Sequence, residues 1–121
     1  MIGIGVDLVE VERMRTALAR TPSLADKLFT EGERAYAEAA RDPAERYAAR
    51  FAAKEAAMKV LGVGLGAVDW HDLEVVRASS GAPELRVTGR AHELAVDAGI
   101  RIWKVSLTHT SSMAEAVVVG L

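Results

Sequence analysis

An alanine-rich segment from Pro43 to Leu61 constrains the fold of this 121-residue chain more than any other stretch. It is preceded by Asp42, begins with proline and continues to Glu45, which together form a strong helix-start signal. Gly62 follows Leu61 and is typical of the position just beyond a helix C-terminus. These signals predict one long helix over residues 43–61, and we expect the rest of the fold to pack against it.

Charged residues interrupt the apolar face of this predicted helix. At about 100° per residue, its large apolar side chains share one arc: Tyr47, Phe51, Met58 and Leu61. Lys54 lies inside the arc, and Glu55 and Lys59 lie at its edge. Because a buried charge is costly unless it is paired, Lys54 must meet a carboxylate or a phosphate, or extend its amine to solvent.

The two halves of the chain differ in their periodicity. Helical patterns are concentrated in the first half, over residues 10–20, 31–40 and 43–61, with one more at 89–98. Alternating patterns typical of strands cover residues 2–7, 73–77, 84–87, 103–109 and 114–119. This arrangement predicts an α+β fold, with an antiparallel sheet packed against the long helix. The strand at the N-terminus must join that sheet from far away in sequence.

Length and composition indicate one domain over residues 1–121. Fifteen basic and 17 acidic side chains give a net charge of −2, which argues against a protein that coats nucleic acid. The absence of cysteine excludes disulfides, thiolate metal sites and cysteine nucleophiles. The N-terminal residues lack the pattern of a signal peptide, and no apolar run is long enough to span a membrane. We therefore expect a soluble cytoplasmic protein.

Two carboxylates indicate a possible metal site. Asp7 ends the N-terminal strand, where Gly3 and Gly5 share its face and would allow another segment to approach closely. If the fold brings Asp7 to Glu55, the pair suits Mg²⁺, which takes one or two carboxylates together with substrate phosphates. Lys59 would then complement phosphate charge. Alternatively, Glu55 and Lys59 form an ordinary surface ion pair, since they are spaced i,i+4.

His109 and the glycine-rich loop after residue 61 are weaker signals. His109 ends a strand pattern beside several hydroxyl residues, where it either donates to a phosphate or is an ordinary hydrogen-bonded histidine. Gly62, Gly64 and Gly66 form the loop, which lacks the Gly-Lys-Ser/Thr ending of a P-loop. Neither feature identifies a function by itself.

Four motifs in chain order carry a specific resemblance. They are Gly3-Ile4-Gly5-Val6-Asp7, then Arg13, then Arg50-Phe51-Ala52-Ala53-Lys54-Glu55-Ala56 with Lys59, and finally Val105-Ser106-Leu107-Thr108-His109-Thr110. In this order, the chain resembles the bacterial holo-acyl-carrier-protein synthase family of 4′-phosphopantetheinyl transferases. The family often has a basic residue before the proline that corresponds to Pro83, where this chain has Ala82.

The resemblance implies a role for each motif residue. Asp7 and Glu55 would be the Mg²⁺ ligands, and Lys59 the lysine that binds phosphate and stabilises charge. The nucleotide of coenzyme A (CoA) would be bound by Arg50 and His109, with Gly64 in the loop that lines it. Arg13 would face an acidic helix of the carrier protein. The resemblance also implies a homotrimer whose active sites lie between subunits.

The implied reaction transfers 4′-phosphopantetheine from CoA to a serine of apo acyl carrier protein and releases 3′,5′-ADP. Glu55 would be the general base, directly or through a metal-bound water, with Asp7 as the alternative. The carrier would belong to either fatty-acid or polyketide biosynthesis. Two alternatives use the same residues differently. One is a magnesium-dependent nucleotide phosphohydrolase with water as nucleophile; the other is a binding module that captures an acidic partner through Arg13 and Arg20.

Overall fold

The computed structural model describes residues 1–121. Its helices are α1 (Val11–Arg20), α2 (Leu24–Leu28), α3 (Glu31–Glu38), α4 (Pro43–Leu61), the 3₁₀ helix η1 (Trp70–Asp72) and α5 (Gly89–Ala98). Its strands are β1 (Gly3–Glu10), β2 (Leu73–Arg77), β3 (Pro83–Val87), β4 (Trp103–His109) and β5 (Met113–Gly120). The predicted elements are all present, and the α+β class is confirmed. The sequence analysis missed two short elements, α2 and η1.

Helix α4 has the predicted bounds, although one of its start signals acts differently. Pro43 occupies the first turn and Gly62 ends the helix in the left-handed conformation, with φ of 70°. Asp42 makes no capping hydrogen bond. Its carboxylate instead lies 2.6 Å from a guanidinium nitrogen of Arg15, which ties the start of α4 to α1. For α3, by contrast, Thr30 and Glu33 form a full capping box at the start of the helix.

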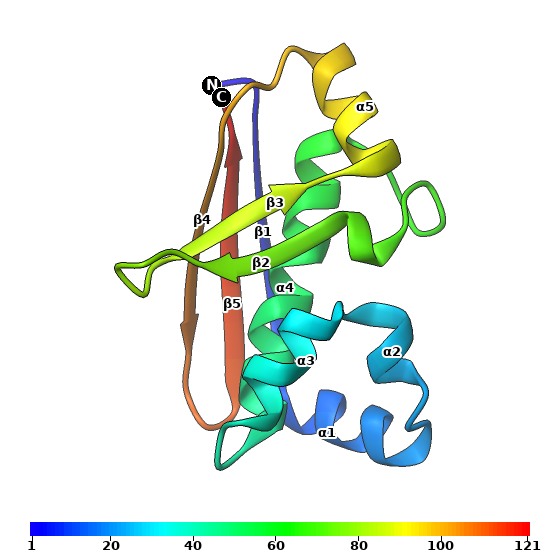
Figure 1. The fold of residues 1–121 in the computed structure, drawn as a ribbon, viewed down its shortest axis with the longest axis vertical. Helices are drawn as coiled ribbons and strands as arrows, with labels where there is room; N and C mark the ends of the chain where they lie inside the picture. The colour runs from blue at the N-terminus through cyan, green and yellow to red at the C-terminus, as the bar shows by residue number, and fades with distance from the viewer.

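The strands form two antiparallel sheets rather than the single one expected. The larger has the order β1-β5-β4, and β2 pairs only with β3. The N-terminal strand joins the larger sheet as predicted, by pairing with β5 from Gly3 opposite Gly120 to Glu10 opposite Met113. In Figure 1 the β2–β3 hairpin crosses the long strands diagonally, and the two chain ends lie together. The hairpin forms a separate layer because its buried residues, Leu73 and Val75, pack onto α4.

Glycines allow α4 to lie directly on the larger sheet. A side chain at Gly5 would collide with the backbone carbonyl of Ala56, and one at Gly120 would meet Val60 at 2.9 Å. The close approach expected at the N-terminal strand is therefore made by the protein's own long helix. This contact fixes the position of β1 along α4.

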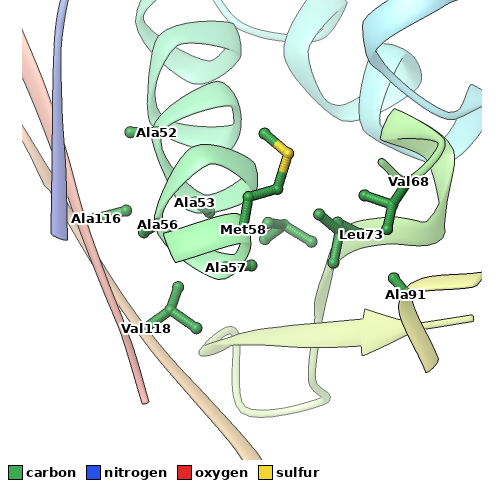
Figure 2. Packing of buried hydrophobic residues seen from close by; sticks show 11 residues of the cluster. Ala52, Ala53, Ala56, Ala57, Met58, Val68, Leu73, Ala91, Ala116 and Val118 are labelled. Atoms are coloured by element: carbon green, nitrogen blue, oxygen red, sulfur yellow. The ribbon is translucent and has the colours of Figure 1, made fainter. Parts of the chain in front are cut away.

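Helix α4 is buried on several sides, not along one arc as the sequence suggested. Its alanines supply most of the contact, and a helix that is apolar nearly all round belongs in a core. Figure 2 shows Ala52 and Ala56 on the side near Ala116 of β5, and Met58 on the side of Leu73. Small residues on the sheet side and a larger one on the hairpin side thus hold α4 between two layers. None of the helices is long and apolar enough to cross a membrane.

Candidate active site

The structure brings Asp7 and Lys59 together from β1 and α4. The ammonium of Lys59 lies 3.2 Å from Oδ1 of Asp7 and donates a 2.7 Å hydrogen bond to the carbonyl of Val6. Asp7 lies two residues beyond Gly5 on the same face of the strand, so the glycine contact with α4 delivers its carboxylate to the helix. Lys59 is half-exposed, whereas Asp7 is mostly covered.

Glu55 completes this cluster. Burial raises the pKa of Glu55 above its ordinary value, the negative charge of Asp7 raises it further, and Lys59 opposes both. Glu55 precedes Lys59 by one helical turn on α4, so its carboxylate lies on the same helix face as the ammonium that pairs with Asp7. The ordinary surface ion pair between Glu55 and Lys59 is wrong, because Lys59 pairs with Asp7 instead.

The donor set of this cluster fits a hard divalent cation. Two neighbouring carboxylates from different elements repel each other, and a cation between them would offset that repulsion. No group of three or more acidic or histidine side chains gathers as a metal site. The remaining positions around an ion at Asp7 and Glu55 would therefore fall to water or substrate oxygens, the arrangement Mg²⁺ favours.

Lys54 has a structural partner. Its side chain is fully buried, and its ammonium lies 2.8 Å from Oε1 of Glu33, which is also fully buried. It donates two further hydrogen bonds, to the carbonyls of Trp70 and Leu73. Of the possibilities left by the sequence, the structure selects the carboxylate.

Arg50 and His109 line a separate cavity of about 480 Å³. The cavity lies between α3, the first half of α4, the β2–β3 hairpin and the end of β4. The Nε2 atom of His109 lies 3.2 Å from a carboxylate oxygen of Glu45, so this histidine has a protein partner. Arg50 is 5% exposed, and its Nε has no hydrogen-bond partner.

The lining residues to which the sequence analysis gave no role include Tyr36, Arg46 and Arg77. One signal was available, because Arg46 and Arg50 are spaced i,i+4 and share a helix face. Nothing in the sequence placed Tyr36 or Arg77 beside them, since α3 and β2 meet here only in the folded chain.

We refer to Asp7, Glu55 and Lys59 as the carboxylate cluster. This cluster and the cavity lie on opposite faces of α4. Nine residues separate Arg50 from Lys59, which is about half a turn in angle and about 13.5 Å along the axis. None of the three cluster residues lines the cavity. Within one chain, the structure therefore does not unite the predicted catalytic residues with the predicted nucleotide-binding residues.

Gly64 and Arg13 lie outside both the carboxylate cluster and the cavity. Gly64 is exposed in the loop after α4, and a Cβ atom there would meet nothing within 4 Å. Arg13 is exposed on α1, which continues directly from the strand carrying Asp7. It forms no ion pair, unlike Arg15, which pairs with Glu12 and Asp42.

Comparison with known proteins identifies the family. The sequence model of the 4′-phosphopantetheinyl transferase superfamily matches residues 3–112. A holo-[acyl-carrier-protein] synthase of Frankia casuarinae is 49% identical over 120 residues, covering 99% of this chain and 97% of the relative.

Solved structures agree over the full length. The holo-[acyl-carrier-protein] synthase of Neisseria meningitidis superposes with a TM-score of 0.90 at 28% identity, covering 100% of this chain and 98% of the other. The Helicobacter pylori synthase in complex with coenzyme A has a TM-score of 0.85 at 26% identity, covering 98% and 99%. The chain therefore belongs to the holo-[acyl-carrier-protein] synthase family of phosphopantetheinyl transferases.

Proposed function

We propose that residues 1–121 form a single transferase domain that moves 4′-phosphopantetheine from CoA to a serine of apo acyl carrier protein, with Mg²⁺. The convergence of Asp7, Glu55 and Lys59 carries this proposal, because it offers carboxylate ligands and a cation for a diphosphate. The family relationship supports CoA as a substrate, since one solved relative is a complex with coenzyme A.

Each residue of the cluster has a distinct part in the proposed reaction. Asp7 and Glu55 would hold Mg²⁺, whose charge would offset that of the CoA diphosphate. Lys59 would turn from Asp7 towards a phosphate oxygen and stabilise the charge that develops there. The serine oxygen bonds to the phosphorus that carries pantetheine, and 3′,5′-ADP departs with the electrons of the broken P–O bond. Glu55, partly buried beside the reacting groups, takes the serine proton.

The proposed active site lies between subunits of a homotrimer. The carboxylate cluster of one chain would face the arginine-lined cavity of the next, because α4 separates the two within a chain. An interface between two different patches is head-to-tail, and such an interface closes into a ring when the rotation between subunits closes, as in a trimer. The outward face of the N-terminal segment supports assembly: Ile2 and, on β1, Ile4, Val6 and Leu8 are all at least 50% exposed.

A direct assay tests the reaction. The purified chain is incubated with CoA, Mg²⁺ and apo carrier protein, and the carrier is weighed by mass spectrometry. We expect a mass gain equal to phosphopantetheine and loss of the gain in Glu55→Gln. Cleavage of CoA at the same rate with and without carrier would instead establish the phosphohydrolase alternative.

Subunit mixing tests the shared site. Glu55→Gln and Arg50→Gln are each expected to be inactive, and each retains the half-site that the other lacks. In randomly co-assembled trimers, about one quarter of the interfaces combine two native halves, so about a quarter of wild-type activity should return. No recovery in verified mixed trimers would place both halves in the same chain. Sedimentation of the wild type gives the oligomeric state independently.

The biological setting follows from the carrier. A fatty-acid carrier and a polyketide carrier remain the two candidates, and comparing kcat/KM for each would distinguish them. The cytoplasmic location expected from the N-terminal sequence remains a prediction, for which cell fractionation is the measurement.

A further inference from the structure

The side chain of Lys59 contacts β1 at both its base and its tip. At the base, a Cβ atom added to Gly5 would come within 3.2 Å of the Cβ of Lys59, so the lysine stem lies directly over this glycine. At the tip, the ammonium donates a hydrogen bond to the carbonyl of Val6 and lies 3.2 Å from Oδ1 of Asp7. Because the side chain is 53% exposed, the ammonium can leave Asp7 without any rearrangement of the core.

Lys59 is the one basic residue that pairs with a carboxylate of this cluster. Asp7 has no second ion-pair partner, and Glu55 has none at all. Burial and the charge of Asp7 raise the pKa of Glu55, and the charge of Lys59 opposes that rise. The ammonium therefore offsets the repulsion between the two carboxylates, which is the electrostatic task of Mg²⁺ in the proposed function.

Lys59 and Mg²⁺ compete for the same carboxylate. A divalent ion at Asp7 supplies twice the positive charge of an ammonium, and two cations on one carboxylate repel each other. Lys59 is the group that leaves, since its ammonium is carried on a flexible four-carbon stem that reaches solvent. The base of that stem stays fixed over Gly5, so the released ammonium remains beside the ion and any phosphate bound to it.

Resting on the proposed function, we propose that Lys59 is an internal counter-ion that Mg²⁺ displaces from Asp7. The ion takes the carboxylate, and Lys59 is released towards the diphosphate of CoA. Binding of Mg²⁺ is then the step that frees the phosphate-binding lysine. The exchange also sets the affinity for the metal, because the ion must replace a contact that already exists.

Metal affinity is the first test. The full-length protein is titrated with MgCl₂ alone, without CoA or carrier, and the backbone amide signals of β1 are followed by NMR. Lys59→Met should bind Mg²⁺ roughly two- to tenfold more tightly than the wild type, because no ammonium has to be displaced. Lys104→Met is the matched control: it removes the same charge from an exposed lysine without an ion pair, and its affinity should equal that of the wild type.

Two results of this titration would overturn the proposal. One is an equal affinity for Mg²⁺ in Lys59→Met and Lys104→Met, which would mean that Lys59 does not compete with the ion. The other is a failure of MgCl₂ to saturate either the wild type or Lys59→Met, which would mean that the free carboxylates do not hold the ion.

The position of the ammonium needs its own measurement, because repulsion without displacement would also weaken metal binding. Hydrogen exchange of the lysine ammonium groups is measured by NMR in the wild type. Without Mg²⁺, the ammonium of Lys59 should exchange more slowly than that of Lys104, because it is hydrogen-bonded to Val6 and Asp7. Saturating MgCl₂ should bring the two rates together. An exchange rate of Lys59 that does not respond to MgCl₂ would show that the lysine stays in place and would overturn the proposal.

Thermal melting at a fixed chain concentration checks the same exchange through linkage. MgCl₂ should raise the Tm of Lys59→Met more than that of the wild type, and an equal rise in both would contradict the exchange. None of these measurements uses CoA or carrier protein. Absence of transfer by the wild type would therefore refute the proposed reaction and leave the exchange intact.

Discussion

Replacing Lys54 by methionine should strongly destabilise the protein, because it breaks a fully buried ion pair. Methionine has a similar length but cannot pair with Glu33, whose carboxylate would remain fully buried. The carbonyls of Trp70 and Leu73 would also lose their donor. Breaking one side of a buried ion pair costs about 3–5 kcal/mol, because the other charge is left without compensation.

The cost is high here because Glu33 cannot move to water. It also accepts backbone hydrogen bonds from Val75 at 2.9 Å and from Thr30 at 3.0 Å. The bond from Val75 links α3 to β2, the bond from Thr30 caps α3, and Lys54 links α3 and β2 to α4. For a chain of this length, the loss corresponds to a fall in Tm of about 10–20 °C.

Thermal and urea unfolding at a fixed chain concentration measure this effect, since assembly would otherwise change the apparent stability. Lys27→Met, an exposed lysine without an ion pair, is the control and should change stability by less than about 0.5 kcal/mol. The double variant Glu33→Gln/Lys54→Met should lose less than the sum of the two single losses. A Lys54→Met protein as stable as the control would refute the reasoning.

Three further predictions concern the site and its approach. Gly5→Ala should destabilise the fold by about 1–3 kcal/mol, because the new methyl group collides with the carbonyl of Ala56; Gly64→Ala, in open space, should melt as the wild type does. Mg²⁺ should raise the Tm of the wild type but not that of Glu55→Gln. Without Mg²⁺, Glu55→Gln should be no less stable than the wild type, because it lacks the repulsion between Glu55 and Asp7. An equal rise in Tm for both proteins would exclude Glu55 from the metal site. Arg13→Glu should raise the KM for the carrier protein roughly tenfold and leave the KM for CoA unchanged, and a KM for carrier equal to that of the wild type would exclude Arg13 from docking.

Local signals in the sequence predicted most elements of the fold. The capping box at Thr30, the proline at residue 43 and the glycine at residue 62 each act within a few residues, so their effect does not depend on the tertiary structure. The short helix α2 has no such signal, since Ser23 provides no capping hydrogen bond. The split into two sheets also escaped prediction, because periodicity shows which residues alternate but not which strands pair.

The candidate site was predictable only in part, for a related reason. The motif resemblance selected Asp7, Glu55 and Lys59, and the structure brings these residues together. The contact of Arg50 and Arg77 with the ring of Tyr36 could not be predicted from the sequence, because the three residues come from three elements that meet only through tertiary packing. Likewise, Lys54 pairs with Glu33 of a different helix, and no spacing rule within one helix or strand reaches that far.

The glycine face of β1 explains why fold and site depend on each other. Gly5 brings the strand against Ala56, and Asp7 on the same face then lies beside the next part of the helix surface, where Glu55 and Lys59 project. A larger residue at position 5 would move the strand away from α4 and separate the two carboxylates, even if both side chains were retained. The same packing keeps the carboxylates and the arginines of one chain apart. With carboxylates on one face of α4 and arginines on the other, the proposed function requires a neighbouring chain to bring both groups onto one substrate.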